Sequence, residues 1–349
     1  MGEKPRKRDR SVTRLKPKPV PSERPPADPA VAMSLKLKPP EDYLLARDLC
    51  SYGYYLLEPN FWDVRTQQFR RVLDLGKRAV TVLIRQPRAK PGSQLNVDID
   101  TKLTTSEAAE LRRQVVRTLR LDEPASTIAA FHALDGRWAA GGRGRVSRSP
   151  TMFEDVIKTV TSCNVTWPST VSMNRKLCFV AGRRATSGLP AFPTAKKLAS
   201  MRPATLRARC GVGYRDGRIV ELAGLFVKGK IDVAWFENPA TPDEEVRKAL
   251  LDLPGIGPYA AANIMQLLGR FGHLPLDTES VRHGRTVLAM RGSGSSIMKR
   301  LHKHFAPFGE HRFRSYWFEL WAFYESKRGP SHTWERETTG KSFTAAALK

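Results

Sequence analysis

The sequence is short of acidic residues: 34 aspartates and glutamates stand against 59 lysines and arginines, so the formal net charge is +25 over 349 residues. A positive field of this size attracts polyanions and gives an affinity that depends on salt but not on base sequence. A nucleic acid is therefore the expected partner. A basic surface that is merely solvated, or one of the ribosomal type, would show the same balance, so charge alone does not separate these cases.

Long apolar runs and paired cysteines are also lacking. No run of about eighteen apolar residues occurs, and the N-terminal residues lack the apolar core of a signal peptide, so membrane insertion and secretion are disfavoured. Cys50, Cys163, Cys178 and Cys210 are far apart and form no C-x-x-C pair, which argues against a zinc ribbon or an iron–sulfur cluster. We expect buried free thiols in a reducing compartment: the cytoplasm and nucleoid of a bacterium, or the nucleus of a eukaryote.

The two ends of the chain are predicted to be tails. Residues 1–40 are rich in lysine, arginine and proline and have almost no large apolar side chains, which predicts a disordered basic tail. Contact with phosphates, a nuclear-import signal and a plain solubilising role are all compatible with this composition. Residues 329–349 are predicted to be a flexible C-terminal tail.

Between the tails, the pattern of apolar residues predicts two domains. Residues 41–140 contain β-rich runs at 79–84 and 95–99 and a helix that Thr105 caps. This pattern predicts an α+β N-terminal domain with a small antiparallel sheet and helices. Residues 141–328 are dominated by helical periodicity, which predicts a mainly α-helical second domain.

The most informative segment is 253–261 (LPGIGPYAA), in which a Gly-x-Gly turn separates two helical stretches. Thr241 and Pro242 predict the start of the first helix, as N-cap and as first helical residue. Gly255 and Gly257 allow backbone conformations that a Cβ would oppose. The turn therefore directs free amide groups and a helix N-terminus outward, which suits a phosphate oxygen, although a plain connection between helices has the same sequence.

A lone carboxylate, Asp277, follows the turn at a separation of about twenty residues, in the segment 274–277 (LPLD). Folding can bring the two together, so Asp277 is the candidate catalytic acid. It is equally suited to cap the helix that follows, and the two roles are compatible. A nuclease or polymerase module with the same turn is a weaker alternative, because no paired carboxylates have the spacing of a metal site.

These motifs resemble the helix-hairpin-helix (HhH-GPD) DNA glycosylase superfamily, in which a Gly/Pro-rich hairpin precedes an essential aspartate. Residues 144–154, 161–164 and 192–215 match the family pattern in the same order, and their spacing is closest to the 8-oxoguanine and 3-methyladenine glycosylase branches. The resemblance covers roughly residues 144–325 and, more loosely, the α+β region. It implies a helical glycosylase domain over 141–328 that everts a damaged or modified base from duplex DNA and hydrolyses its N-glycosidic bond.

The resemblance also implies roles for single residues. Asp277 would stabilise the positive charge that develops on the sugar and would orient or deprotonate the attacking water. Tyr214, on a glycine-flanked turn, would be the wedge that holds the bent duplex open, Asn164 would enter the space left by the base, and Arg215 would bond a phosphate. The alternatives from the residues alone are that Tyr214 only ends a turn, that Asn164 caps a helix, and that Arg215 is an exposed arginine without a specific partner.

Relatives with lyase activity carry a lysine two residues after the second hairpin glycine, and here that position is Tyr259. Because a tyrosine forms no Schiff base, the resemblance implies a monofunctional hydrolase that leaves an abasic site. The alternative is a bifunctional glycosylase/lyase acting on an oxidised purine, with Lys228 or Lys230 supplying the amine.

The base that would be excised is less defined. Ser169 stands where the 8-oxoguanine branch has an arginine that reads the opposite cytosine, which argues against that lesion. Alkylated purines are the leading interpretation, since an electron-rich pocket holds a cationic base by cation–π stacking. The aromatic residues of 313–324 are expected to be core. The candidates for the base pocket are Tyr259 and, with core packing as the default interpretation, Tyr54, Tyr55, Trp62 and Trp167.

The resemblance implies no organic cofactor, no metal ligand set and no iron–sulfur cluster; the one ion it allows is a monovalent cation at the hairpin. We expect the chain to act as a monomer on double-stranded DNA in base excision repair. The alternative from another functional class is a catalytically silent DNA-binding protein that uses the same hairpin.

Overall fold

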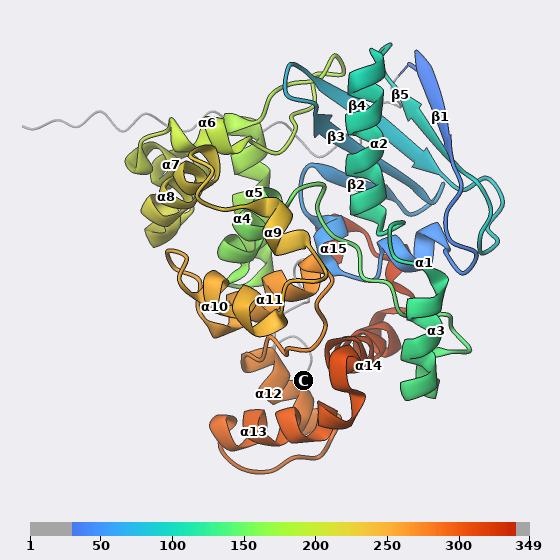
Figure 1. The fold of residues 1–349 in the computed structure, drawn as a ribbon, viewed down its shortest axis with the longest axis vertical. Coiled ribbons are helices and arrows are strands. Elements are labelled where there is room, and N and C mark those ends of the chain that lie inside the picture. The colour runs from blue at the N-terminus through green and yellow to red at the C-terminus, as the bar shows by residue number, and fades with distance from the viewer. Residues whose placement is uncertain (1–29, 340–349) are drawn as a thin grey trace, which may run out of the picture.

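A computed structural model describes residues 30–339 of the chain, and residues 1–29 and 340–349 lie outside the described part. Most of the predicted basic tail therefore lies outside the described residues. A sheet with its covering helix occupies one end of the molecule and helices make up the rest, as the sequence predicts (Figure 1). None of the helices between residues 30 and 339 is long and apolar enough to cross a bilayer.

The N-terminal part is built on a five-stranded antiparallel sheet with the strand order β1-β5-β4-β3-β2. Two of its strands coincide with the β-rich runs of the sequence. Val97 in one of them lies opposite Ile84 of its neighbour, and both side chains are buried. The strands are β1 (Met33–Leu37), β2 (Asn60–Asp63), β3 (Gln68–Asp74), β4 (Ala79–Arg85) and β5 (Leu95–Ile99).

Helix α2 (Thr105–Leu119) crosses one face of this sheet and covers its apolar side chains (Figure 1). Leu111, Val115 and Leu119 are buried, as their helical spacing predicts. The N-cap is Thr104, one residue before the predicted Thr105. Its hydroxyl accepts the N–H of Glu107, whose carboxylate accepts the N–H of Thr104 in return, which makes a capping box.

The predicted tails are too long at both boundaries. Strand β1 lies inside the range 1–40, where Met33, Leu35 and Leu37 alternate with polar residues and β1 pairs with β5 along its whole length. At the other end, residues 331–339 form the short helices η5 (Ser331–Thr333) and α15 (Arg336–Thr339), and Trp334 is buried. The reason is the same in both places: each segment carries a few apolar side chains that the N-terminal core buries.

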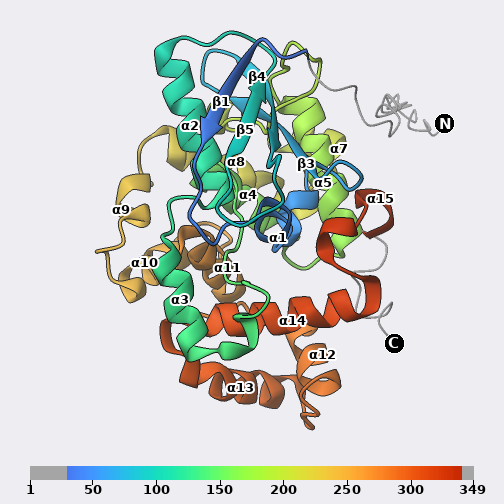
Figure 2. The same ribbon diagram turned by 90° about the vertical axis from the view of Figure 1, so that its right-hand side faces the viewer.

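The remaining chain is helical, as predicted. Figure 2, turned by 90°, shows the long helix α14 running beneath the sheet region, with α12 and α13 below it. The helices not yet given are α1 (Leu45–Leu49), η1 (Gly53–Leu56), α3 (Ala125–Leu134), η2 (Gly136–Trp138), α4 (Met152–Ser162), α5 (Trp167–Ala181), α6 (Ala195–Ala199), α7 (Pro203–Cys210), η3 (Gly213–Arg215), α8 (Asp216–Val227), α9 (Val233–Glu237), α10 (Asp243–Leu251), α11 (Pro258–Leu268), α12 (Thr278–Thr286), α13 (Gly294–Phe305), η4 (Ala306–His311) and α14 (Arg312–Arg328).

Two hydrophobic clusters hold these elements together. One joins the sheet to α13 and α14, so that Val97 and Phe305 belong to the same core, and the other joins α4 through α11. The C-terminal helices thus share their core with the N-terminal sheet, although they follow the hairpin in sequence. Helix α11 belongs to both clusters, since Leu267 lies in the first and Ile264 and Leu268 lie in the second, and residues of α11 also line the candidate site.

Candidate active site

The predicted hairpin joins α10 to α11. Gly255 has a φ of +75°, in the left-handed region that favours glycine, and a Cβ there would lie 2.4 Å from Cδ of Arg218. Gly257 is the N-cap of α11, and Pro258 takes its first helical position. Both glycines are exposed, so the amide groups at the start of α11 are open to an anion from outside.

Asp277 holds the start of α12 with one of its two carboxylate oxygens. Oδ1 accepts the backbone N–H of Glu279 at 2.9 Å and of Ser280 at 3.0 Å, and the Ser280 hydroxyl at 3.2 Å. No residue in the described part of the chain donates a hydrogen bond to Oδ2. Burial raises the pKa of Asp277, and the hydrogen bonds from Ser280 oppose that shift. The predicted cap is therefore present, and it leaves Oδ2 without a hydrogen bond from a described residue.

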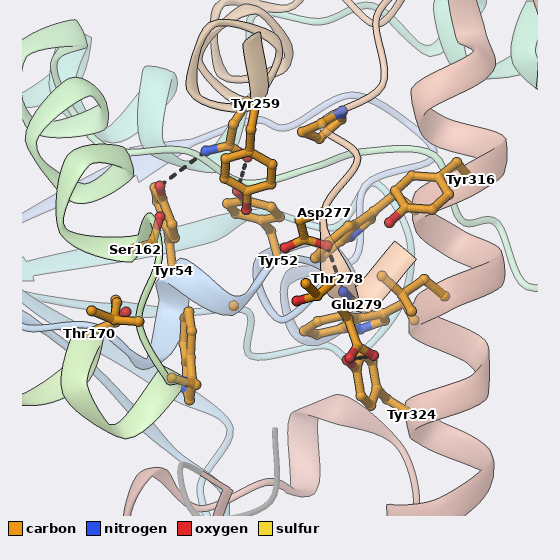
Figure 3. Close-up of a pocket in the computed structure, with 18 of the residues that line it drawn as sticks. Tyr52, Tyr54, Ser162, Thr170, Tyr259, Asp277, Thr278, Glu279, Tyr316 and Tyr324 are labelled. Atoms are coloured by element: carbon orange, nitrogen blue, oxygen red, sulfur yellow. Dashed lines mark hydrogen bonds between the residues drawn. The ribbon is translucent and has the colours of Figure 1, made fainter. Parts of the chain in front are cut away.

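That free oxygen belongs to a residue lining a cavity of about 340 Å³, a size typical of small-molecule sites. The cavity lies between η1, α5, α11, the start of α12 and α14 (Figure 3). Its charged lining residues, within the described chain, are Asp277 and Glu279. Its aromatic lining residues are Tyr52, Tyr54, Trp167, Tyr259, Tyr316, Trp317, Trp321 and Tyr324.

A hydrogen-bond network fixes one wall of this cavity. The hydroxyl of Tyr52 donates to Oδ1 of Asn263 at 2.7 Å, and the amide of Asn263 donates to Thr159 at 2.9 Å and to the Tyr54 hydroxyl at 3.3 Å. Burial raises the pKa of Tyr259 well above its ordinary value, and the Asp277 charge acts in the same direction, so this phenol stays neutral. The wall is thus rigid, aromatic and uncharged.

Of the predicted pocket residues, Tyr54, Tyr259 and Trp167 line the cavity and two others do not. The prediction for Tyr55 and Trp62 is wrong: both are buried, and they donate to the backbone carbonyls of Ser331 and His332. The C-terminal segment that was predicted to be a tail covers them. Their polar atoms are used in fixing that segment, so neither ring faces the cavity.

The prediction that Arg215 bonds a phosphate is also wrong. Its side chain is 5% exposed, and its guanidinium donates to the carbonyls of Val160 and Cys163 at the end of α4. Those carbonyls are among the last of a helix and lack partners within it. Asn164 follows them in the left-handed region, with a φ of +52°, and is exposed. Arg215 therefore supports the turn that presents Asn164, and Cys163, not Asn164, is the C-cap.

Tyr214 is 55% exposed, which is unusual for a large aromatic residue. The guanidinium carbons of Arg215 and Arg218 lie 4.3 Å and 5.4 Å from the centroid of its ring. Two cations thus hold the ring in place while leaving it open to solvent. Arg218, which the sequence did not single out, also lies against Gly255 and so connects the Tyr214 turn to the hairpin.

No family model matches the sequence, and no curated protein matches it. Several solved structures are similar to the structure of this chain. A 3-methyladenine DNA glycosylase from Archaeoglobus fulgidus superposes with a TM-score of 0.63 at 19% identity, over 83% of this chain and 99% of that one. The 8-oxoguanine glycosylase/lyase of Clostridium acetobutylicum gives 0.61 at 16% identity, over 82% and 96%. Its complex with double-stranded DNA containing cytosine opposite 8-oxoguanine gives 0.60 at 17% identity, over 85% and 99%.

The chain has the fold of these DNA glycosylases. This confirms the predicted fold class, an α+β domain followed by a helical domain with the hairpin. Within this glycosylase fold, none of the described residues that line the cavity is a lysine. Lys228 and Lys230 are exposed residues after α8 and do not line it. Lys158 lies behind Tyr54, with its Nζ 5.7 Å from that ring, and is paired with Glu154 at 2.7 Å.

Sequence reasoning missed Glu279 and the aromatic face of α14. Glu279 stood in the segment after Asp277, where a carboxylate is expected in the first turn of a helix. Trp317 and Trp321 were expected to be core, and Trp321 is indeed buried. They also line the cavity, so the same residues of α14 belong to the first cluster and to the site.

Proposed function

We propose that the chain is a DNA glycosylase that hydrolyses the N-glycosidic bond of a damaged or modified base everted from duplex DNA. The observation that carries the proposal is the free Oδ2 of Asp277 in an aromatic cavity of about 340 Å³. A purine is a flat aromatic group that such a cavity can enclose and stack against. The fold, shared with 3-methyladenine and 8-oxoguanine glycosylases, supports the same reaction class.

Asp277 is the proposed catalytic residue. As the base departs, the sugar gains oxocarbenium character, and a fixed carboxylate oxygen beside it stabilises this positive charge. The same oxygen can accept a proton from the water that attacks the sugar. The cap holds the carboxylate in one orientation, so little reorganisation is needed when the charge develops.

The exposed features around the cavity would act on the DNA. The hairpin amides at Gly255 and Gly257 would bind a phosphate, and Tyr214 would enter the base stack and keep the duplex bent. Asn164, at the exposed turn after α4, would fill the space left by the base. A monovalent cation at the hairpin would be held by backbone carbonyls, because Gly255, Ile256 and Gly257 carry no polar side chain. The net charge of +25 supports salt-dependent binding to duplex DNA, and we propose that the chain binds it as a monomer.

We further propose that the enzyme is monofunctional. Tyr259 occupies the position of the lyase lysine, and no lysine is among the described residues that line the cavity. Borohydride traps the Schiff base of a lyase as a covalent adduct with DNA, and none is expected here. A trapped adduct would favour the bifunctional alternative.

The deciding experiment compares wild type with Asp277→Asn on duplexes that each carry one modified base. Base release is measured with alkali, which cleaves abasic sites, and without it, which reports lyase activity. Asp277→Asn is expected to lower base release at least about 100-fold, while duplex affinity stays at the wild-type level. Equal release by the two proteins would exclude Asp277 as the catalytic group. Duplex binding without release from any lesion by wild type would support the silent DNA-binding alternative.

A further inference from the structure

Glu279 is a second carboxylate in the cavity of Asp277, on the first turn of α12. Its backbone N–H donates to Oδ1 of Asp277 at 2.9 Å, so both residues are fixed at the N-terminus of one helix. In Figure 3, Tyr259 lies on one side of Asp277, and Glu279 lies on the other with Tyr324. The cavity therefore has an acidic group beyond the proposed catalytic one.

One oxygen of Glu279 receives every hydrogen bond that the carboxylate accepts from the described residues. Oε1 accepts hydrogen bonds from Nε of Arg282 at 2.6 Å and from the hydroxyl of Tyr324 at 2.5 Å. A terminal nitrogen of the Arg282 guanidinium also lies 2.5 Å from Oε1. No described residue donates to Oε2. Arg282 itself is held over the ring of Phe323, 4.5 Å from the centroid. The side chain of Glu279 is thus oriented by its neighbours and keeps one acceptor free.

A simple ion pair does not explain this geometry. An arginine and a carboxylate that only neutralise one another commonly form two parallel hydrogen bonds, one to each oxygen. Here three donor atoms converge on Oε1. The charge of Glu279 is largely compensated by Arg282, so its free oxygen can face a bound nucleotide without strong repulsion from the phosphates.

The remaining polar groups of the cavity leave this role open. Both ends of the Asn263 amide are used within the wall, by Tyr52 on one side and by Thr159 and Tyr54 on the other. No arginine or lysine is among the described residues that line the cavity. The hydroxyls of Tyr259 and Thr278 also line the cavity without a hydrogen bond to a described residue, but a hydroxyl both donates and accepts and so does not select one kind of edge. The free carboxylate oxygens of Asp277 and Glu279 only accept, and they favour a base edge that donates.

We propose that Oε2 of Glu279 accepts an N–H of the everted base, and that the enzyme selects purines whose edge presents such a donor, as an exocyclic amino group does. This inference rests on the proposed function, because it assumes that the base occupies the cavity. It makes Glu279 a specificity-determining residue. A base whose edge presents only acceptors would leave the carboxylate oxygen buried without a partner, which is unfavourable.

Glu279→Gln tests the proposal because it reverses the polarity of the free atom. Arg282 and Tyr324 would hold the amide oxygen, and the amide NH2 would then face the cavity as a donor. The matched control is Glu245→Gln, the same change at an exposed residue of α10. The substrates are duplexes with one 3-methyladenine, which keeps its amino group, or one 1,N6-ethenoadenine, whose amino nitrogen is closed into a ring and carries no hydrogen.

Glu279→Gln is expected to lower kcat/KM at least about tenfold on 3-methyladenine and to change it little on ethenoadenine. The ratio of the two rates should be unchanged in Glu245→Gln. Because both bases are tested on one variant, any loss of folded protein cancels in the ratio. An equal effect of Glu279→Gln on both bases, or no effect on either, would overturn the proposal.

A binding measurement separates this inference from the proposed reaction. Adenine and ethenoadenine are placed opposite cytosine as 2′-fluoro nucleotides, whose glycosidic bonds resist hydrolysis, and the affinity of each duplex is measured by titration. Glu279→Gln should weaken binding of the adenine duplex at least about tenfold relative to the ethenoadenine duplex. If wild type releases no lesion, the proposed reaction is wrong. The comparison of the two duplex affinities then still decides whether Glu279 reads the base. If the ratio is the same in wild type and variant, Glu279 does not read the base.

Discussion

Arg218 lies against Gly255: a Cβ on the glycine would be 2.4 Å from Cδ of the arginine. The same arginine has its guanidinium 5.4 Å from the ring of Tyr214. One exposed side chain thus connects the hairpin with the turn that carries the proposed wedge. A phosphate held at the hairpin and a base pair opened at the Tyr214 turn would therefore lie at a defined distance from one another. Base eversion at a fixed site requires such a fixed distance.

Gly255→Ala and Gly257→Ala should separate stability from DNA binding. The first variant places an L-residue in the left-handed region, at about 1–2 kcal/mol, and forces Arg218 to move, so both Tm and duplex affinity should fall. Gly257 is extended and has no atom within 4 Å of an added Cβ. Its alanine variant should keep a Tm close to that of wild type and lose duplex affinity, because the methyl group obstructs a phosphate. Thermal unfolding and duplex titration measure the two effects, and wild-type affinity in Gly257→Ala would argue against a phosphate at the hairpin.

Base release should decline on acidification from a higher pH than an ordinary aspartate would give. Burial raises the pKa of Asp277 above its usual 3.8, and the proposed mechanism needs the ionised form, which is present above that raised pKa. The decline should therefore begin above the ordinary range of aspartic acid, in a single-turnover pH profile of base release. A profile that is flat down to the ordinary pKa would contradict a partly buried catalytic Asp277.

The same pKa shift predicts the stability of Asp277→Asn. Because the folded-state pKa is raised, ionising Asp277 destabilises the protein as the pH rises from 3.8 to the folded value, and this loss persists at neutral pH. Asparagine is uncharged and caps helices as well as aspartate does. Asp277→Asn should therefore have a Tm equal to or above that of wild type at pH 7 and lose this advantage at acid pH. A large drop in Tm at pH 7 would show that the charge stabilises the fold.

The parts of the site that the sequence predicts are those set by local chemistry. Gly255 and Gly257 define a turn by their backbone freedom, and Asp277 caps whatever helix follows it. The β-rich runs of the sheet and the helix through Leu111 follow from short periodic patterns. In each case the deciding residues are neighbours in the chain, so no knowledge of the tertiary packing is needed.

The failures of sequence prediction involve contacts between distant residues. Tyr55 is closed off by Ser331, 276 residues away, and Arg215 is buried because the end of α4 lies over it. The helical spacing of Trp321 indicates burial but not which element buries it. Trp321 belongs to the hydrophobic core and also lines the cavity. Only the tertiary packing shows that one side chain does both.

Tyr52→Phe and Tyr55→Phe form a matched pair that tests which tyrosine belongs to the cavity. Both hydroxyls are buried, and both changes remove a donor from an acceptor, at about 1–3 kcal/mol for the group left unpaired. Both variants should therefore have a lower Tm. Only Tyr52→Phe should lower kcat/KM for base release, because Tyr52 orients Asn263 in the cavity wall. A loss of activity in Tyr55→Phe at temperatures well below its Tm would show that Tyr55 does contribute to the site.

Tyr214→Ala should affect the opening of the duplex and nothing else. The ring is 55% exposed, so its removal should leave Tm unchanged. Inserting a side chain into the stack compensates an unstacking energy of a few kcal/mol, so release of a lesion from a fully paired duplex should fall about 10- to 100-fold. The same lesion in a single strand needs no such opening, and its slower release should be equal in wild type and variant. If Tyr214→Ala slowed both substrates alike, the tyrosine would act on the base or the sugar, and the proposed division between an exposed wedge and a buried catalytic cavity would be wrong.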